Sequence, residues 1–159
     1  MLDLIFTIKF VHVLAVTLMF GTWFALAIFM MLAHRSSNTS VVAVTSQFVV
    51  KVELTVVAAA IVLQPLSGFP LAFAIGLSPL REFWIVLSSA LYVAIVACWI
   101  AAVCIEMRIR RLTRQAALAG LPLSAAYRRL FRIWCVLAAA ILIGMLAVFA
   151  FMIWQPRLD

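Results

Sequence analysis

The sequence predicts an all-α membrane protein, a four-helix bundle that forms a single transmembrane domain over residues 1–159. The first observation behind this prediction is composition. Apolar residues make up 69 % of the chain and charged residues only 11 %, whereas soluble domains are about a quarter charged. The second is that four apolar segments can each cross about 30 Å of hydrocarbon at about 1.5 Å per residue. They are 8–31, 50–72, 83–106 and 131–154.

Charged and aromatic residues mark the ends of these segments, as expected for side chains that prefer the headgroup level. They are Lys9, His34, Arg35, Lys51, Arg81, Glu82, Trp84, Arg108, Arg132 and Trp154. The first segment lacks the basic start and small-residue cleavage site of a signal peptide, so we expect it to stay in the mature protein. The connections are predicted as a Ser/Thr-rich stretch over 34–47, a tight turn over 77–82 and a long basic loop over 107–130.

The basic residues predict the orientation. Seven of the twelve lie between Arg108 and Arg132, on the same side of the membrane as Arg35 and Lys51. The positive-inside rule makes this side cytoplasmic and places both termini outside. We expect the basic loop to attract anionic lipid headgroups. Because hydrophobic spans flank it on both sides, we expect no nucleic-acid partner.

Small residues at helical spacing predict where the helices pack closely. The stripes are Thr17–Gly21–Ala25, Gly68–Ala72–Gly76, Ala90–Ala94–Ala101 and Ala140–Gly144–Ala147. Pro65 lies inside the second segment, where it should free a backbone carbonyl and kink the helix. Within a membrane, such a carbonyl requires a polar partner.

Polar groups inside a span suggest function, because they are costly in lipid. At 100° per residue, two stripes are expected to point inward. One is Glu53, Val57, Ala60, Gln64, Ser67 and Gly68, and the other is Ser88, Tyr92, Trp99 and Glu106. Two interpretations follow, a ligand-binding pocket near the outer leaflet or hydrogen bonds that only fix the bundle, and we favour the second. The residues concerned are His12, Gln64, Ser67, Ser88 and Tyr92.

His12 has the chemistry of a haem or metal ligand or of a proton-transfer group. His34, the only other histidine, lies on the same helix at a distance of about 33 Å, so the two cannot bind one haem within a monomer. A second ligand would come from another subunit, from Met19 or Met145, or be absent. The sequence leaves open whether His12 faces the bundle, because His12 and Gly21 point about 180° apart around the helix.

At the cytoplasmic end, charged residues are expected to form a structural ion-pair layer, since all of them lie near water. They are Arg35, Glu53, Glu106, Arg108 and Arg132, with Lys51 beside them. Glu53 could serve as the coupling carboxylate of a small multidrug-type oligomer, but its place beside Lys51 argues against this. No pair of carboxylates is recognised at mid-membrane.

The remaining motifs argue against several enzyme classes. The sequence contains no phosphate loop, no HExxH and no plausible Ser-His-Asp set, so a hydrolase or ATP-driven machine is not expected. Cys98, Cys104 and Cys135 lie in apolar runs without a CxxC spacing and are predicted to be free.

Several motifs together resemble an uncharacterised bacterial family of predicted integral membrane proteins. They are FVHVLAVTLMFG (Phe10 to Gly21), AHR (Ala33 to Arg35), LQPLSG (Leu63 to Gly68), the Trp99 region and the basic run after Met107. The resemblance covers essentially the full chain, and it implies a bacterial inner membrane but no established activity.

A more distant likeness is to membrane proteins that bind b-type haem through a histidine in their first helix, such as haem-containing protoporphyrinogen oxidases. His12 followed by Gly21–Thr22–Trp23 is similar to their opening helix. Those oxidases pair this histidine with a lysine on a later helix, and no lysine follows Lys51 here. The sequence is therefore consistent with two functions. One is an accessory or oligomeric module, as a homo-oligomer or as a subunit of a membrane complex, without its own catalytic centre. The other is a redox protein with His12 as an axial ligand of haem b.

Overall fold

The computed structural model describes residues 2–155, and within that range the only regular elements are helices. The elements are α1 (Leu2–Arg35), α2 (Thr39–Val52), η1 (Glu53–Val57), α3 (Ala58–Ala74), α4 (Phe83–Leu118) and α5 (Ala125–Trp154). Because α2, the π turn η1 and α3 are continuous, they form a single rod. The chain therefore has four rods in residues 2–155, each long and apolar enough to cross a membrane. The predicted all-α four-helix membrane fold is confirmed.

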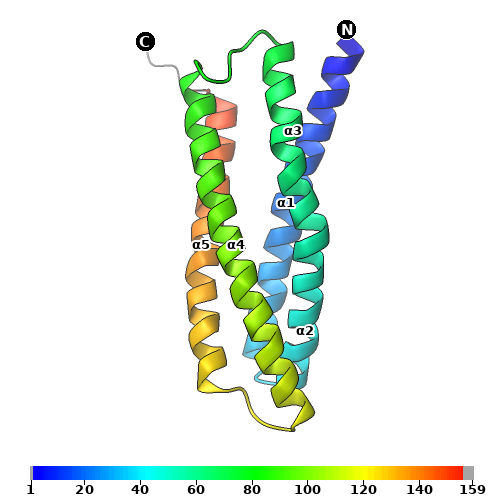
Figure 1. The fold of residues 1–159 in the computed structure, drawn as a ribbon, viewed down its shortest axis with the longest axis vertical. Coiled ribbons are helices and arrows are strands. Elements are labelled where there is room, and N and C mark those ends of the chain that lie inside the picture. Colours follow the sequence, from blue (N-terminus) through cyan, green and yellow to red (C-terminus); the bar gives the residue numbers. More distant parts are fainter. Residues whose placement is uncertain (1, 156–159) are drawn as a thin grey trace.

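The rods run up and down, so that the α1–α2 and α4–α5 connections lie at one end and the two termini at the other (Figure 1). We call the end with the two connections the loop end. The most extensive packing joins α4 to α5, α1 to α3 and α2 to α4. Near the termini, helix α4 lies beside α5 and apart from α3, and toward the loop end it crosses onto α2, as Figure 1 shows.

The helices extend well beyond the apolar segments that predict them. The second rod begins at Thr39, and most of the predicted loop 107–130 is helical, since α4 ends at Leu118 and α5 begins at Ala125. The true connections are 36–38 and 119–124. The predicted loops were too long because hydropathy measures affinity for lipid, whereas arginine, glutamine, alanine and leucine continue a helix readily in water.

Local chemistry explains where the helices end. Asn38 caps α2 by accepting hydrogen bonds from the backbone N–H groups of Ser40 and Val41 at 3.0 and 3.2 Å. Ser124 caps α5 in the same manner through its bond from the Tyr127 N–H at 3.2 Å. At the other ends of α3 and α4, Gly76 and Gly120 take φ values of +80° and +64°. This left-handed conformation closes a Schellman turn in each case, with the N–H of the next residue bonded back into the helix.

One continuous apolar core joins all four rods, and most of its side chains belong to the half nearer the loop end. Its fully buried members include Met30, Val42, Val49, Val57, Ile109, Tyr127 and Ile141. Between α2 and α4, the buried hydroxyls of Ser46 and Thr113 lie 3.1 Å apart and share a hydrogen bond. Sequence analysis did not single out this pair, because each hydroxyl can also bond its own helix and gives no sign of a partner.

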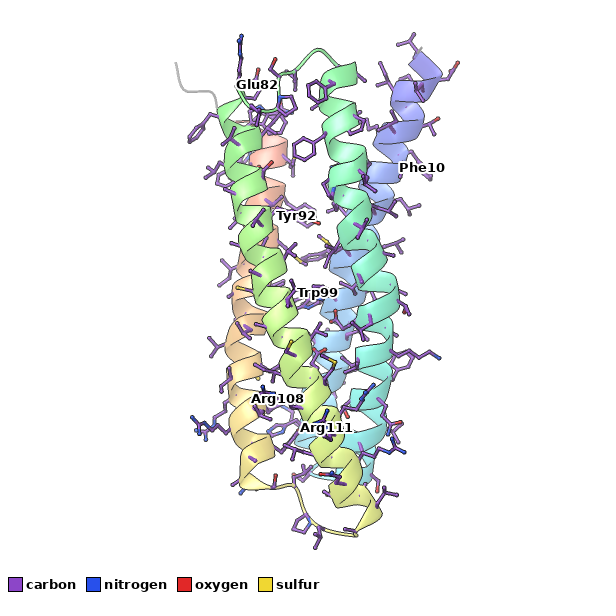
Figure 2. All side chains as sticks on the ribbon, viewed as in Figure 1. Phe10, Glu82, Tyr92, Trp99, Arg108 and Arg111 are labelled. Carbon is purple, nitrogen blue, oxygen red and sulfur yellow. The ribbon has the colours of Figure 1, made fainter. Side chains whose placement is uncertain are left out.

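The outer surface is strongly apolar, with large side chains such as Phe10 projecting away from the bundle (Figure 2). In each rod, only 17 to 28 % of the most apolar stretch is buried. The remainder faces outward, as expected for helices in contact with the lipid bilayer.

Two of the four small-residue stripes lie at helix contacts and two do not. Gly144 of α5 lies against Ile95 of α4, and Gly68 of α3 lies against His12 of α1. The stripe of α4, Ala90–Ala94–Ala101, is exposed throughout. In the stripe of α1, Thr17 and Gly21 are exposed, and a Cβ at Gly21 would meet nothing within 4 Å. The prediction that these two stripes pack inside the bundle was wrong, because spacing alone does not fix the direction in which a stripe faces.

Candidate functional site

His12 joins α1 to α3 through a compact group of polar contacts. Its Nδ1 lies 3.0 Å from Oγ of Ser67, and the Gln64 side-chain amide donates to the backbone carbonyl of His12 at 3.3 Å. The Ser67 hydroxyl also lies 2.6 Å from the backbone carbonyl of Leu63 in its own helix. We call His12, Gln64 and Ser67 the histidine clasp. It brings together three of the five residues predicted to share one level.

Gly68 makes room for the imidazole ring. A Cβ at this position would lie 3.0 Å from Cε1 of His12 and 3.4 Å from its Nδ1. The ring therefore packs directly on the backbone of α3. This settles the rotational setting of α1 that the sequence left open, since His12 faces α3 while Gly21 faces outward.

Tyr92 accounts for the carbonyl freed by Pro65. A proline at 65 cannot donate to the carbonyl of Ile61, four residues earlier. The Tyr92 hydroxyl of α4 donates to that carbonyl instead, as the sequence argument required. Helix α3 continues through Pro65. The rod departs from regular α-helix at the π turn η1, which precedes α3.

Ser88 does not join the clasp. The side chain is 2 % exposed, and within residues 2–155 its hydroxyl has no hydrogen-bond partner. Tyr92 also bonds a different part of α3 from the one that His12 contacts. The predicted five-residue group is therefore divided in the described chain into the clasp, the Tyr92–Ile61 bond and an isolated Ser88.

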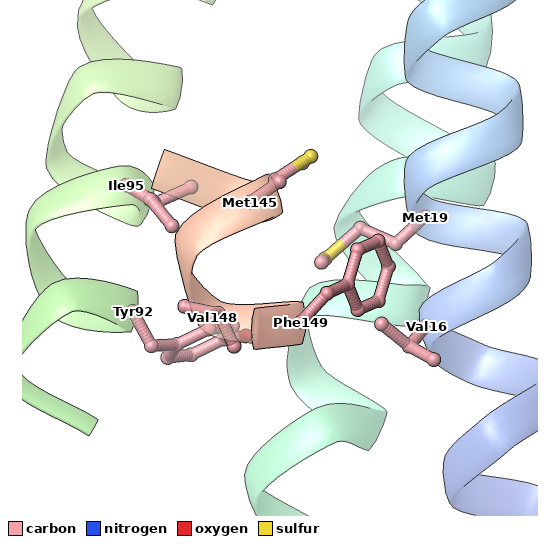
Figure 3. A pocket seen from close by; sticks show the side chains of 7 residues that line it. All are labelled: Val16, Met19, Tyr92, Ile95, Met145, Val148 and Phe149. Atoms are coloured by element: carbon pink, nitrogen blue, oxygen red, sulfur yellow. The ribbon is translucent and has the colours of Figure 1, made fainter. Parts of the chain in front are cut away.

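A small cavity lies next to Tyr92 between α1, α4 and α5 (Figure 3). It measures about 20 Å³, and its lining side chains are Val16, Met19, Tyr92, Ile95, Met145, Val148 and Phe149. Pockets for cofactors and drug-sized ligands typically span about 300–1,000 Å³. This cavity is therefore far too small for a porphyrin, although both methionines considered as second haem ligands line it.

At the loop end, His34 lies between aromatic residues of α5. Its Nδ1 is 2.9 Å from the Tyr127 hydroxyl, and its ring stacks on Phe131 with centroids 3.8 Å apart. Both histidines of the chain are therefore used to join α1 to another helix.

The inward direction of the two polar stripes is confirmed for their carboxylates. Glu53 is 1 % exposed and accepts a hydrogen bond from the Trp99 indole at 2.6 Å. Glu106 is 2 % exposed and accepts one from the Trp134 indole at 2.7 Å. Figure 2 shows Trp99 lying between α4 and the neighbouring rods.

The described residues do not form the expected ion-pair layer. Glu53 and Glu106 are turned into the bundle, whereas the basic side chains meant to pair with them, Arg35, Lys51, Arg108 and Arg132, are all exposed. Both carboxylates take their hydrogen bonds from tryptophan. The layer was expected because the residues lie at similar heights, but their positions around each helix separate the two signs of charge.

The sequence did not predict that Glu53 and Glu106 are both buried and both bonded to tryptophan. Glu53 lies about 21 Å along its rod from Thr39. Glu106 lies about 18 Å from the end of α4. Trp99, which bonds Glu53, lies seven residues before Glu106 on the same face of α4. The two inward stripes could have indicated this arrangement, because each contains one glutamate.

Four membrane-length apolar helices, with Glu53 and Glu106 turned inward, define an integral membrane protein. A family model described as "Predicted integral membrane protein (DUF2269)" matches residues 6–156, and the chain belongs to this family. The family resemblance drawn from the motifs is thereby confirmed. Comparison with curated proteins and with solved structures gives no match, so the likeness to haem-containing oxidases gains no support from them. All three cysteines are free, as predicted.

Proposed function

We propose that the chain is an accessory or oligomeric module of a bacterial inner membrane, without a catalytic centre of its own. The observation that carries this proposal is the small-residue stripe Thr17–Gly21–Ala25, of which Thr17 and Gly21 stay outside the bundle. The supporting argument is that the histidine clasp and the Tyr92–Ile61 bond use polar groups to join helices rather than to line a pocket.

The exposed stripe on α1 suits contact with another transmembrane helix. Gly21 presents bare backbone with open space in front of it. The Thr17 hydroxyl already donates to the carbonyl of Val13 at 2.8 Å, so it can enter an apolar interface without losing a partner. Small residues four apart allow two helix backbones to approach closely, and packing contacts then drive association in lipid. We propose that a second copy of this chain docks here.

The test is the mass of the purified protein in lipid nanodiscs or mild detergent. Wild type should be a dimer or larger oligomer, and Gly21→Leu should shift it to monomer by at least tenfold in dissociation constant. Ala139→Leu, at an exposed position of α5, is the matched control and should leave the mass unchanged. A monomeric wild type, or a Gly21→Leu protein with unchanged mass, would refute self-association through this stripe.

The positive-inside argument supports placing the loop end in the cytoplasm. Nine of the twelve basic residues belong to the rods and turns at that end, and all nine are exposed. They are Arg35, Lys51, Arg108, Arg110, Arg111, Arg114, Arg128, Arg129 and Arg132. Such a belt should attract anionic lipid headgroups, each basic residue contributing about 1 kcal/mol near the surface.

Orientation and lipid preference have separate tests. Ala119→Cys, in a variant lacking the native cysteines, should react with a membrane-impermeant reagent only after cells are opened. Labelling of intact cells would reverse the topology. For lipids, the detergent-purified protein should retain phosphatidylglycerol in preference to a neutral lipid, and salt should weaken this preference, whereas equal retention would exclude the headgroup contact.

The alternative function, a redox protein with haem b, is favoured by one observation at His12. Its Nδ1 is held by Ser67, which is how histidine ligands are usually oriented, while Nε2 has no hydrogen-bond partner within the described residues. Because the cavity beside Tyr92 is far too small for a porphyrin, we place the haem of this alternative between subunits. A reduced-minus-oxidised visible spectrum tests this. A haem band lost in His12→Ala would make His12 the ligand, and a colourless protein expressed with ample haem would exclude the redox function.

A further inference from the structure

The two buried glutamates lie on facing elements in the half of the bundle nearer the loop end. Glu53 begins the π turn η1, and Glu106 lies on α4, which packs along α2 immediately before that turn. Each carboxylate has one indole N–H donor, Trp99 for Glu53 and Trp134 for Glu106. We call Glu53 and Glu106 the carboxyl pair. Together with Trp99 and Trp134, they link η1, α4 and α5.

Among residues 2–155, no basic side chain forms an ion pair with the carboxyl pair. The basic residues nearest in sequence, Lys51, Arg108 and Arg110, are exposed, as is Arg132 on α5. Helix α1 has no titratable residue between His12 and His34, and His34 bonds Tyr127. The remaining titratable neighbours are thiols, of which Cys135 lies next to Trp134 and Cys104 is exposed. A buried carboxylate without a counter-charge is costly, and a second one nearby increases that cost.

One oxygen atom of the pair is left without a partner. Oε2 of Glu106 is buried and, within residues 2–155, neither donates nor accepts a hydrogen bond. An unpaired buried acceptor destabilises the fold, and the cost rises when the acceptor is charged. This atom therefore points to a ligand that binds a lone carboxylate oxygen in a closed space.

Size and donor number decide which ligand fits. A calcium ion needs about 6–8 oxygen ligands, and no group of three or more metal-binding side chains occurs in the described part of the chain. Oε2 of Glu106 is closed off from the surface of the bundle, so an organic cation cannot reach it without displacing side chains. A proton needs neither space nor further ligands, and binding it removes the buried negative charge.

We propose that Glu53 and Glu106 form a proton-binding site inside the bundle, with the proton carried on Oε2 of Glu106. Binding one proton from water converts one carboxylate into a neutral carboxylic acid and removes the repulsion between the two groups. The indoles of Trp99 and Trp134 keep both side chains in place in either state. The π turn at Glu53 supports such a role, because π turns in α-helices are frequent at functional sites.

Infrared spectroscopy of the full-length protein in lipid nanodiscs tests the proposal, because the C=O stretch of a protonated carboxyl is separate from amide and carboxylate bands. Wild type at neutral pH should show this band, and Glu106→Gln should remove it. Glu53→Gln should move the midpoint of its titration to lower pH, since the repelling charge is gone. Glu82→Gln, at the opposite end of α4, is the control and should leave the band unchanged.

Two further measurements cover the other outcomes. Trp134→Phe keeps Glu106 but removes its donor, so it should shift the frequency of the band, which assigns the band even if Glu106→Gln fails to fold. Replacing choline chloride by sodium chloride should have no effect, and loss of the band in sodium would show a metal-cation site and overturn the proposal. Absence of a protonated carboxyl in wild type at neutral pH would overturn it as well. None of these results depends on the oligomeric state.

Discussion

The contact between Gly144 and Ile95 offers a quantitative test of the packing between α4 and α5. A Cβ added at Gly144 would lie 2.8 Å from Cγ1 and 3.1 Å from Cδ1 of Ile95. Carbon atoms pack best at about 3.5–4.0 Å, so Gly144→Ala forces a displacement of at least about 0.5 Å. Overpacking of this kind costs about 1–3 kcal/mol, against which alanine gains about 1 kcal/mol over glycine in a helix. We therefore expect Gly144→Ala to lower the free energy of unfolding by about 0–2 kcal/mol.

The decisive measurement is a double-mutant cycle with Ile95→Ala. That substitution removes both clashing atoms and alone should cost about 2–5 kcal/mol through the cavity it leaves. In the double variant the new methyl group enters that cavity, so the combined cost should be smaller than the sum by about 1–3 kcal/mol. Reversible unfolding by SDS in mixed micelles, followed by circular dichroism, gives each value.

Gly21→Ala is the matched control for this cycle, because its Cβ meets nothing within 4 Å and the stripe on α1 stays small. It should be neutral or stabilising by up to about 1 kcal/mol, and additive with Ile95→Ala. Additivity of Gly144→Ala with Ile95→Ala, to within about 0.5 kcal/mol, would refute the inferred close approach of the two helices.

Two polar contacts yield predictions of the same kind. Tyr92→Phe should lower the free energy of unfolding by about 1–3 kcal/mol, because it leaves the carbonyl of Ile61 unpaired. The loss should shrink when Pro65→Ala restores a local N–H donor, and an equal loss in both backgrounds would contradict this assignment. Tyr127→Phe should cost about 0.5–1.5 kcal/mol by removing the bond to His34, whereas an unchanged SDS midpoint would show that the stacking of His34 carries that contact alone.

The two inward stripes show which features of the fold the sequence could predict. Their members at Glu53, Gln64, Ser67 and Glu106 were predicted to face the interior from periodicity, and all four are buried. Periodicity fixes the relative direction of residues within one helix, and a polar stripe on an apolar rod has one favourable direction. The stripe containing Gly21 has no such preference, since small apolar residues are tolerated in lipid and in a helix contact alike.

The charged end of the bundle could not be predicted in the same way. Glu106 and Arg110 are four residues apart, a spacing that suits an ion pair within one helix, yet Glu106 is buried and Arg110 is exposed. Whether a glutamate bonds an arginine of its own helix or an indole of another depends on tertiary packing. Trp134 lies on α5, in a part of the chain that the helical pattern of α4 does not constrain.

The setting of α1 links the histidine clasp to the proposed interface. Because His12 and Gly21 point about 180° apart, one rotation of the helix decides both positions. The bond to Ser67 and the space made by Gly68 hold His12 against α3, and Gly21 must then face away from the bundle.

Weakening the clasp should therefore weaken self-association as well, since a rotated α1 no longer presents Gly21. Ser67→Ala should raise the dissociation constant of the oligomer even though Ser67 is buried on another helix. Unchanged association would separate the two features.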